Sequence, residues 1–480
     1  MNTRPSTSPF NEALWQETIR RRELRRYAFF LCELADKVQL TEDFTTDTPI
    51  KLAKLIEESS RLLAECIQLI PPNNLQEVDD FLGKIAAHLR YVERAKVTQT
   101  PWSIIQTAEE FLKKQAGANS NFIIRPTWSY NYSLIGEFCE FYQIVLKCWS
   151  WFPLDKLKNL VPFLSSETIY CISFPRTERQ NCLLHTNWGH EVGHIIASRW
   201  MNAKFGNLWS SAEPDIRKRI EDEVRKNPPP VDPLFKEVAI HDVSSRKART
   251  AMEAARTGLT ELVCDIIGIH LFGPAALAAA LEFAVRFELD ASPLECDYYP
   301  PWRYRLRTMI DYCKDDLENH EGVGYPGDVI TPFINWLREA NNVVAIQNDV
   351  AVIKSKIETR EAYDFIENNW KDIYVEVIES LPSDSSKPYR LYERPSIIES
   401  LVSRLQSMIP PNETEFLSNT PACLQDILTS AWVYKIQKIV QDNEWGTISD
   451  FSLLFRLVLK GCESSHIHSV WGKLLKEIES

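Results

Sequence analysis

Apolar residues recur at spacings of three and four along most of this chain, and no other feature of the sequence restricts its fold as much. Leu31, Leu34 and Val38 show the spacing near the N-terminus. Such a period places apolar side chains on one face of an α-helix. Segments rich in Pro, Thr, Asn and Asp typically end or cap helices. Such segments lie at residues 41–49, 70–74 and 98–102, between the stretches with the helical spacing. The sequence therefore predicts a mainly α protein.

The pattern divides the chain into three regions. Residues 1–120 are predicted to be a helical bundle, and residues 326–480 show helical patterns again. Between them, residues 121–325 are predicted to form the core of the protein. This core contains a short β-type run at residues 167–175 and a polar helical segment at about residues 200–255.

The charge balance argues against nucleic acid as the main partner. The chain carries a net charge of −12, so it lacks the basic field that collects phosphate backbones or anionic lipid. A basic cluster at Arg20–Arg26 has acidic residues nearby and is interpreted as a solvated helix face. With 44% apolar and 25% charged residues, the composition is that of an ordinary globular protein.

The cysteines and the apolar segments of the sequence indicate the cellular compartment in which the protein is expected. The eleven cysteines include no CxxC pair, which excludes a thiolate zinc site and a disulfide framework and favours a reducing environment. The N-terminus has no apolar core of the length that a signal peptide requires. The segment Ile266–Val285 is apolar, but His270, Glu282 and a Gly-Pro break predict a buried pair of helices rather than a membrane span. We therefore expect a cytoplasmic protein with no membrane partner.

The stretch "NWGHEVGHIIASRW" contains candidate metal ligands and a candidate general base. Residues four apart on a helix lie on one face, so His190 and His194 can direct both imidazoles at one metal ion. Glu191 lies about 100° around the helix and can reach a water at that ion as a general base. Gly193 costs the helix about 1 kcal/mol relative to alanine, which indicates that a neighbour packs closely against it. His185 lies off this face and is interpreted as a cap or core residue.

A catalytic zinc ion needs a third protein ligand and one open position. The later stretch "TGLTELVCDIIGIH" offers Glu261, followed four residues later by Asp265 on the same helix face. A glutamate that ligates the metal and an aspartate that accepts the ring N–H of a ligating histidine would complete the site.

HEVGH followed on a later helix by ExxxD resembles the gluzincin group of zinc metallopeptidases. The resemblance implies one Zn²⁺ per chain, held by His190, His194 and Glu261. It also implies that Glu191 acts as base and acid, and that Asp265 pairs with a ligating histidine, most simply His190. The chain is then expected to be a metalloendopeptidase that hydrolyses peptide bonds with a water activated by the metal.

The resemblance covers roughly residues 165–310 and implies a zincin-like core flanked by helical regions. In this chain 66 residues separate His194 from Glu261, more than in compact members of the group, which is why an inserted helical arm is predicted at about residues 200–255. A metzincin is excluded, because "HEVGHIIASRW" lacks the glycine and third histidine of that pattern.

Peptidases usually hold a further donor at the oxyanion of the reaction. The segment "CDYYPPWRYRLRTM" resembles one that follows the third ligand in several such peptidases, and it implies Tyr299 and Arg305 in this role. Tyr298, Arg303 and His241 are the competitors, and an aromatic corner that packs a helix start is the alternative interpretation.

Two other functions stay open at this point. The site could be inactive or could hold structural zinc, in a helical scaffold or sensor that binds a protein partner. It could also belong to an amidase that acts on a small molecule, which would show as a closed pocket. For the peptidase, the expected partners are a peptide or protein substrate and a regulatory protein bound through the helical flanks.

Overall fold

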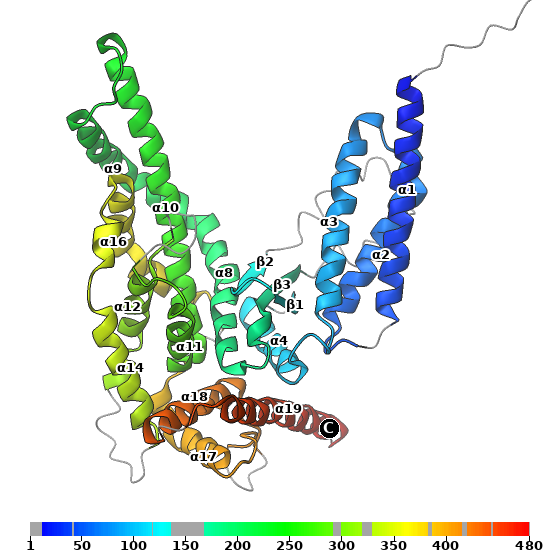
Figure 1. The fold of residues 1–480 in the computed structure, drawn as a ribbon, viewed down its shortest axis with the longest axis vertical. Helices are drawn as coiled ribbons and strands as arrows, with labels where there is room; N and C mark the ends of the chain where they lie inside the picture. The colour runs from blue at the N-terminus through cyan, green and yellow to red at the C-terminus, as the bar shows by residue number, and fades with distance from the viewer. Residues whose placement is uncertain are drawn as a thin grey trace, which may run out of the picture. The chain divides into compact units, whose positions relative to one another are not determined.

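The computed structural model of the protein describes residues 12–40, 43–117, 119–135, 168–290, 299–318, 329–382, 386–414, 420–442 and 445–479. These residues are mainly helical, with one small sheet, so the predicted mainly α class is confirmed. The chain divides into two compact units that are discontinuous in sequence (Figure 1). Unit 1 comprises Met1–Ile105, Asn119–Thr127 and Ile135–Ser173, and unit 2 comprises Gln106–Ala118, Trp128–Leu134 and Phe174–Ser480.

Unit 1 contains a bundle of three amphipathic helices. They are α1 (Glu12–Gln39), α2 (Thr48–Cys66) and α3 (Leu75–Arg94), joined by the short turns η1 (Ile67–Leu69) and η2 (Pro72–Asn74). The predicted spacing of three and four is buried along α1, where Leu31 and Val38 join the core. Pro49 in the first turn of α2 pre-sets a helical backbone and removes an N–H that would have no partner there.

The sheet has three strands in the order β1-β3-β2. These are β1 (Ser120–Thr127), β2 (Ser133–Ile135) and β3 (Thr168–Pro175). The β-type run predicted at residues 167–175 is therefore confirmed as β3, which is buried along nearly its whole length.

Unit 2 holds the helices around the predicted site. Helix α4 (Trp102–Ala116) leads into the sheet, and α8 (Trp188–Trp200) carries the HEVGH stretch. The predicted arm segment forms a π-helical turn η6 (Met201–Phe205), α9 (Gly206–Lys226), η7 (Pro233–Phe235) and the first half of α10 (Lys236–Phe272), and α9 lies beside α10 (Figure 1). The bounds of the three predicted regions stay a prediction.

The apolar segment Ile266–Val285 forms a buried helix pair, as predicted, except that Val285 follows the second helix and is exposed. Helix α10 ends at Gly273, whose φ of 58° is a left-handed conformation that glycine adopts readily. Pro274 then begins α11 (Pro274–Ala284) at its first position. Across the part of the chain that the structure describes, no helix has both the length and the apolar character needed to cross a bilayer.

The remaining helices of unit 2 follow α11. They are α12 (Trp302–Tyr312), α13 (Lys314–Glu318), α14 (Thr331–Val344), α15 (Asp349–Ile353), α16 (Ile357–Glu379), α17 (Pro395–Gln406), α18 (Leu424–Gln441) and α19 (Ile448–Glu479), with short turns at η4 (Arg176–Glu178), η5 (Cys182–Asn187) and η10 (Leu391–Glu393). Helix α16 packs along α10, and α12 packs against α10 near its C-terminal half. The C-terminal half of α10 is consequently buried, including its polar residues Glu261 and Asp265.

Candidate metal centre

Two helices approach each other unusually closely at this site. A Cβ atom built on Gly193 of α8 would lie 2.8 Å from the Cα atom of Cys264 on α10. A Cβ atom on Gly268 of α10 would lie 3.2 Å from the backbone nitrogen of His190. Glycine at these positions lets the two backbones touch, which confirms the close packing predicted at Gly193. The contact brings the acidic residues of α10 within reach of the histidines of α8.

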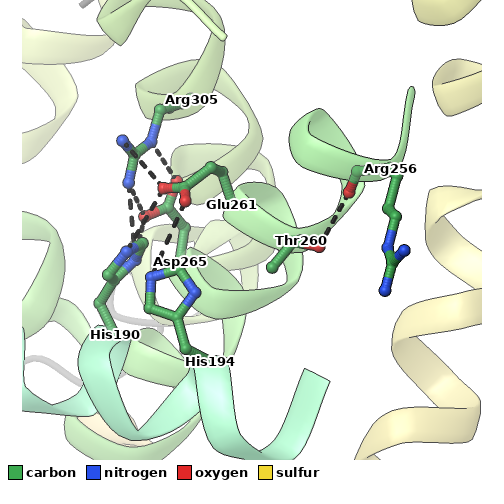
Figure 2. A network of polar contacts seen from close by, with 7 residues as sticks. All are labelled: His190, His194, Arg256, Thr260, Glu261, Asp265 and Arg305. Atoms are coloured by element: carbon green, nitrogen blue, oxygen red, sulfur yellow. Dashed lines mark hydrogen bonds and ion pairs between the residues drawn. The ribbon is translucent and has the colours of Figure 1, made fainter. Parts of the chain in front are cut away.

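Both histidines direct a ring nitrogen at Glu261 (Figure 2). Nε2 of His190 lies 3.5 Å from Oε2 of Glu261, and Nε2 of His194 lies 3.8 Å from Oε1. The three residues can offer ligand atoms that all lie within 4.8 Å of one another. Around a tetrahedral zinc ion with bonds of about 2.0–2.2 Å, ligand atoms are roughly 3.4 Å apart. The donor set and its spacing therefore fit one zinc ion.

Asp265 lies behind His190. Its Oδ1 is 2.8 Å from Nδ1 of His190, so an N–H on Nδ1 can donate to the carboxylate while Nε2 keeps its lone pair toward Glu261. Histidines that ligate metals commonly make this second contact. The structure thus brings together the five residues that the resemblance implied, and pairs Asp265 with His190 as predicted.

Arg305 of α12 is bonded to Asp265. Its Nε donates to Oδ2 and its Nη2 to Oδ1 of Asp265, both at 2.7 Å, and its guanidinium carbon lies 4.3 Å from the centre of the Trp302 ring. Its Nη1 is also 3.5 Å from Oε2 of Glu261. These contacts differ from the predicted role of an oxyanion donor, because the forked donors of the guanidinium are already directed at carboxylates.

Tyr299 is half-buried and lies shortly before α12, which begins at Trp302. It lines the same cavity as the histidines, and burial, followed by the negative charge of the hydrogen-bonded Glu261 carboxylate, raises the pKa of its hydroxyl. A tyrosine in this setting stays protonated and can donate a hydrogen bond.

The competitors of Tyr299 and Arg305 are placed less favourably. Arg303 donates to Asp290 at 3.2 Å and also to the carbonyl of Val343. His241 is exposed on α10, twenty residues before Glu261, or about 30 Å along the helix axis. Tyr298 lies outside the described residues.

Burial and neighbouring charges shift the pKa values of three site residues away from their usual ranges. Glu191 is only 4% exposed, and burial raises the pKa of its carboxyl group to about 7. Burial lowers the pKa of His194 to about 4, helped by the neighbouring His190. At His190 burial also acts to lower the pKa, but the hydrogen bonds to Asp265 and Glu261 outweigh it and raise the pKa to about 10. Two buried carboxylates thus favour a positive charge at His190, which a metal cation can supply in place of the proton.

The candidate ligands face a cavity of about 510 Å³, a typical size for a ligand site. Glu191 lines this cavity together with His190, His194 and Glu261. A substrate in the cavity would therefore lie beside both the metal ligands and the candidate base.

Several residues at the site were not found from the sequence. The backbone of Leu134 in β2 hydrogen-bonds to Glu191, and only the tertiary fold brings these two residues together. Tyr130 and Tyr132 also line the cavity.

Helix α11, which the sequence predicted as part of a buried helix pair, also contributes to the cavity lining. Ala276, Ala280 and Phe283 line the cavity, as does Phe287 just after the helix. Their spacing of four, three and four was a usable signal, because it places all four side chains on one helix face.

Two further histidines, His185 and His270, are core residues. His185 is fully buried and bonded to the hydroxyl of Tyr132 at 3.0 Å. His270 is buried, and its Nδ1 lies 3.1 Å from the hydroxyl of Tyr312. Neither of them is part of the ligand cluster.

The likeness to gluzincins thus rests on a motif and on the local geometry described above. Two histidines one turn apart on α8 face a glutamate on α10, and an aspartate one turn further along α10 contacts a histidine. Comparisons of the whole chain with protein families, with curated proteins and with solved structures find no match.

Proposed function

We propose that this protein is a zinc-dependent metallopeptidase with a zincin-like catalytic core. One observation carries the proposal: Nε2 atoms of His190 and His194 converge on the carboxylate of Glu261 in a cavity that Glu191 also lines. Nitrogen and carboxylate donors in this number are those of catalytic zinc sites.

His190, His194 and Glu261 would hold the metal. When bound, zinc supplies an activated water and polarises the carbonyl of the substrate. Glu191 takes a proton from the attacking water and returns it to the nitrogen of the leaving amine. Burial raises the pKa of its carboxyl group, and the positive charge of a bound zinc ion would lower that pKa again, which favours the carboxylate form that takes the proton. We keep Tyr299 as the candidate donor to the developing oxyanion, a role in which its hydroxyl would exchange its hydrogen bond to Glu261 for one to the oxyanion.

Asp265 and Arg305 act through His190. Asp265 accepts the N–H of Nδ1 and so selects the tautomer of His190 that presents a lone pair on Nε2. The two hydrogen bonds from Arg305 hold the Asp265 carboxylate ionised and fixed in orientation. We therefore assign Arg305 as a positioning residue and leave Tyr299 as the candidate oxyanion donor.

The alternative of structural zinc in a scaffold is less well supported. Structural zinc sites are closed and use four protein ligands. Among the described residues, the cluster that could hold a metal has three members, and these face the cavity. Three ligands would leave one coordination position of a zinc ion open toward the cavity, which favours a catalytic over a structural site.

Metal analysis of wild type, Glu261→Ala and Glu191→Gln tests the proposal. We expect about one zinc per chain in wild type and in Glu191→Gln, little zinc in Glu261→Ala, and zinc-dependent peptide cleavage by wild type alone. A wild type without metal, or full zinc in Glu261→Ala, would remove the three-ligand site. Full zinc without cleavage of any peptide would favour the scaffold.

We also propose a cytoplasmic location, in which a regulatory protein binds through the helical flanks. The cysteines in the described residues are all free thiols, and six of them are buried. Free buried thiols suit a reducing compartment.

A further inference from the structure

Helix α11 presents one face to the cavity, and that face changes from small to aromatic along the chain. Ala276 and Ala280 come first, then Phe283 and Phe287. The two alanines contribute only a methyl group each, so they leave space beside the helix. The two phenylalanines close the space at one end.

The aromatic end is a packed wall. The ring centre of Phe283 lies 5.3 Å from that of Tyr130, 5.3 Å from that of Phe287 and 5.8 Å from that of Trp302. Phe287 and Trp302 stack at 6.2 Å. These rings brace one another at distances typical of aromatic pairs, and Tyr130, Phe287 and Trp302 also line the cavity.

The charged residues that line the cavity all belong to the metal centre, and one of them, Arg305, stacks on Trp302 of the aromatic wall with its guanidinium carbon 4.3 Å from the ring centre. These acidic and basic residues are Glu191, Glu261, Asp265 and Arg305. The one acidic residue of α11, Glu282, is not part of the lining and pairs with Lys435. A charged side chain bound between α11 and the aromatic wall would lose its hydration and find no oppositely charged lining residue other than those of the metal centre.

We infer that this part of the cavity is a specificity pocket for a large apolar side chain, aliphatic or aromatic, next to the bond that is cleaved. The inference rests on the proposed peptidase function. A peptide carbonyl at the metal end leaves the adjacent side chain beside Ala280 and the aromatic wall, where burial of apolar surface is favourable. Ala280 sets the width of the pocket and Phe287 closes its far wall.

Alanine-rich peptides with one varied residue, Phe, Leu, Ala, Asp or Lys, test the pocket on the zinc-loaded full chain. We expect kcat/KM for cleavage next to Phe or Leu to exceed that next to Asp or Lys by at least about tenfold. Ala280→Leu should lower kcat/KM for the Phe peptide at least about tenfold more than it lowers kcat/KM for the Ala peptide. Zinc content and thermal unfolding of each variant show whether it is folded and loaded.

Phe287→Ala carries the test if Ala280→Leu does not fold. Phe287 is only half-buried, so its truncation widens the pocket without emptying the core and should reduce the preference for Phe over Ala. The control is Val285→Ala, because Val285 is 77% exposed and does not line the cavity. A wild type that cleaves next to charged residues as readily as next to Phe, or a preference unchanged in both pocket variants, overturns the inference.

Binding to zinc-loaded Glu191→Gln separates the pocket from the chemistry. Tighter binding of the Phe peptide than of the Asp peptide, with no cleavage by wild type, would keep the pocket and remove the peptidase. Cleavage by wild type without preference would keep the peptidase and remove the pocket. If the Phe peptide is neither bound nor cleaved, both the pocket and the peptidase function are overturned.

Discussion

Glu191 is the residue on which the proposed chemistry most depends. Its carboxyl group is buried and lines the same cavity as the three candidate metal ligands, within reach of a water at the metal. We expect Glu191→Gln to lower kcat by about 10²–10⁴-fold with a smaller effect on KM, since general acid–base catalysis contributes that much. Steady-state kinetics on a peptide that wild type cleaves would measure this. An unchanged kcat in zinc-loaded Glu191→Gln would exclude Glu191 as the base.

Asp265 is expected to affect zinc affinity although it is not one of the proposed metal ligands. Asp265→Asn keeps the shape of the side chain but removes the charge that holds His190 and Arg305. We expect zinc affinity to fall by about 10–100-fold, as for other partners of ligating histidines. Competition with a chelator of known affinity measures the change. Asp311→Asn on the exposed face of α12 is the control and should bind zinc like wild type.

His185 makes stability depend on acid. Burial lowers the pKa of His185 to about 3, whereas a histidine in an unfolded chain has a pKa near 6.5. Below pH 6.5 the unfolded chain therefore binds a proton that the folded protein excludes, and stability falls as the pH falls toward 3. This one residue should cost about 2–3 kcal/mol between pH 6.5 and pH 4.5.

Denaturant unfolding across that pH range can isolate the contribution of His185. In His185→Gln, which can still bond to the Tyr132 hydroxyl, the free energy of unfolding should fall less steeply with acid than in wild type. The slope should differ by up to about 1.4 kcal/mol per pH unit. His241→Gln, an exposed change on α10, should keep the wild-type slope. Equal slopes in His185→Gln and wild type would contradict the buried neutral state of His185.

Among the elements, the crossing of α8 and α10 matters most for the site. Gly193→Ala would place a methyl group 2.8 Å from the Cα of Cys264, so the helices must separate or the methyl must overlap backbone. We expect a loss of about 1–3 kcal/mol in the free energy of unfolding, as for other overpacked sites, together with weaker zinc binding. The control is Gly472→Ala in α19, where the new Cβ meets nothing within 4 Å. That change should stabilise its helix by about 0.5–1 kcal/mol.

Local periodicity predicted the elements better than it predicted their contacts. The helices with His190 and Glu261 and the strand at residues 168–175 follow from spacing alone. The motif also placed Asp265 beside His190. The bidentate contact of Arg305 with Asp265 could not be predicted, because 39 residues separate them and only the packing of α12 on α10 brings them together. The bond of Leu134 to Glu191 has the same cause.

At the scale of the whole molecule, the candidate site belongs to one unit. Helices α8, α10, α11 and α12, which carry most of the cavity lining, are all in unit 2. The arm of α9 and the first half of α10 lies between His194 and Glu261 in sequence, so the ligand set is built from residues that are far apart in the chain. Helices α1, α2 and α3 of unit 1 contribute no residue to the lining.

Removal of the metal should therefore act on one unit only. A ligand bound to the folded state at 1,000 times its dissociation constant stabilises that state by about 4 kcal/mol, so chelation should accelerate amide hydrogen exchange in α8 and the C-terminal half of α10 by up to about 10³-fold. Exchange in α1, α2 and α3 should not change. Glu261→Ala should exchange rapidly in α8 with or without chelator. Equal acceleration in both units would mean that zinc controls the folding of the entire chain, as a structural metal would, and would weigh against a local catalytic centre.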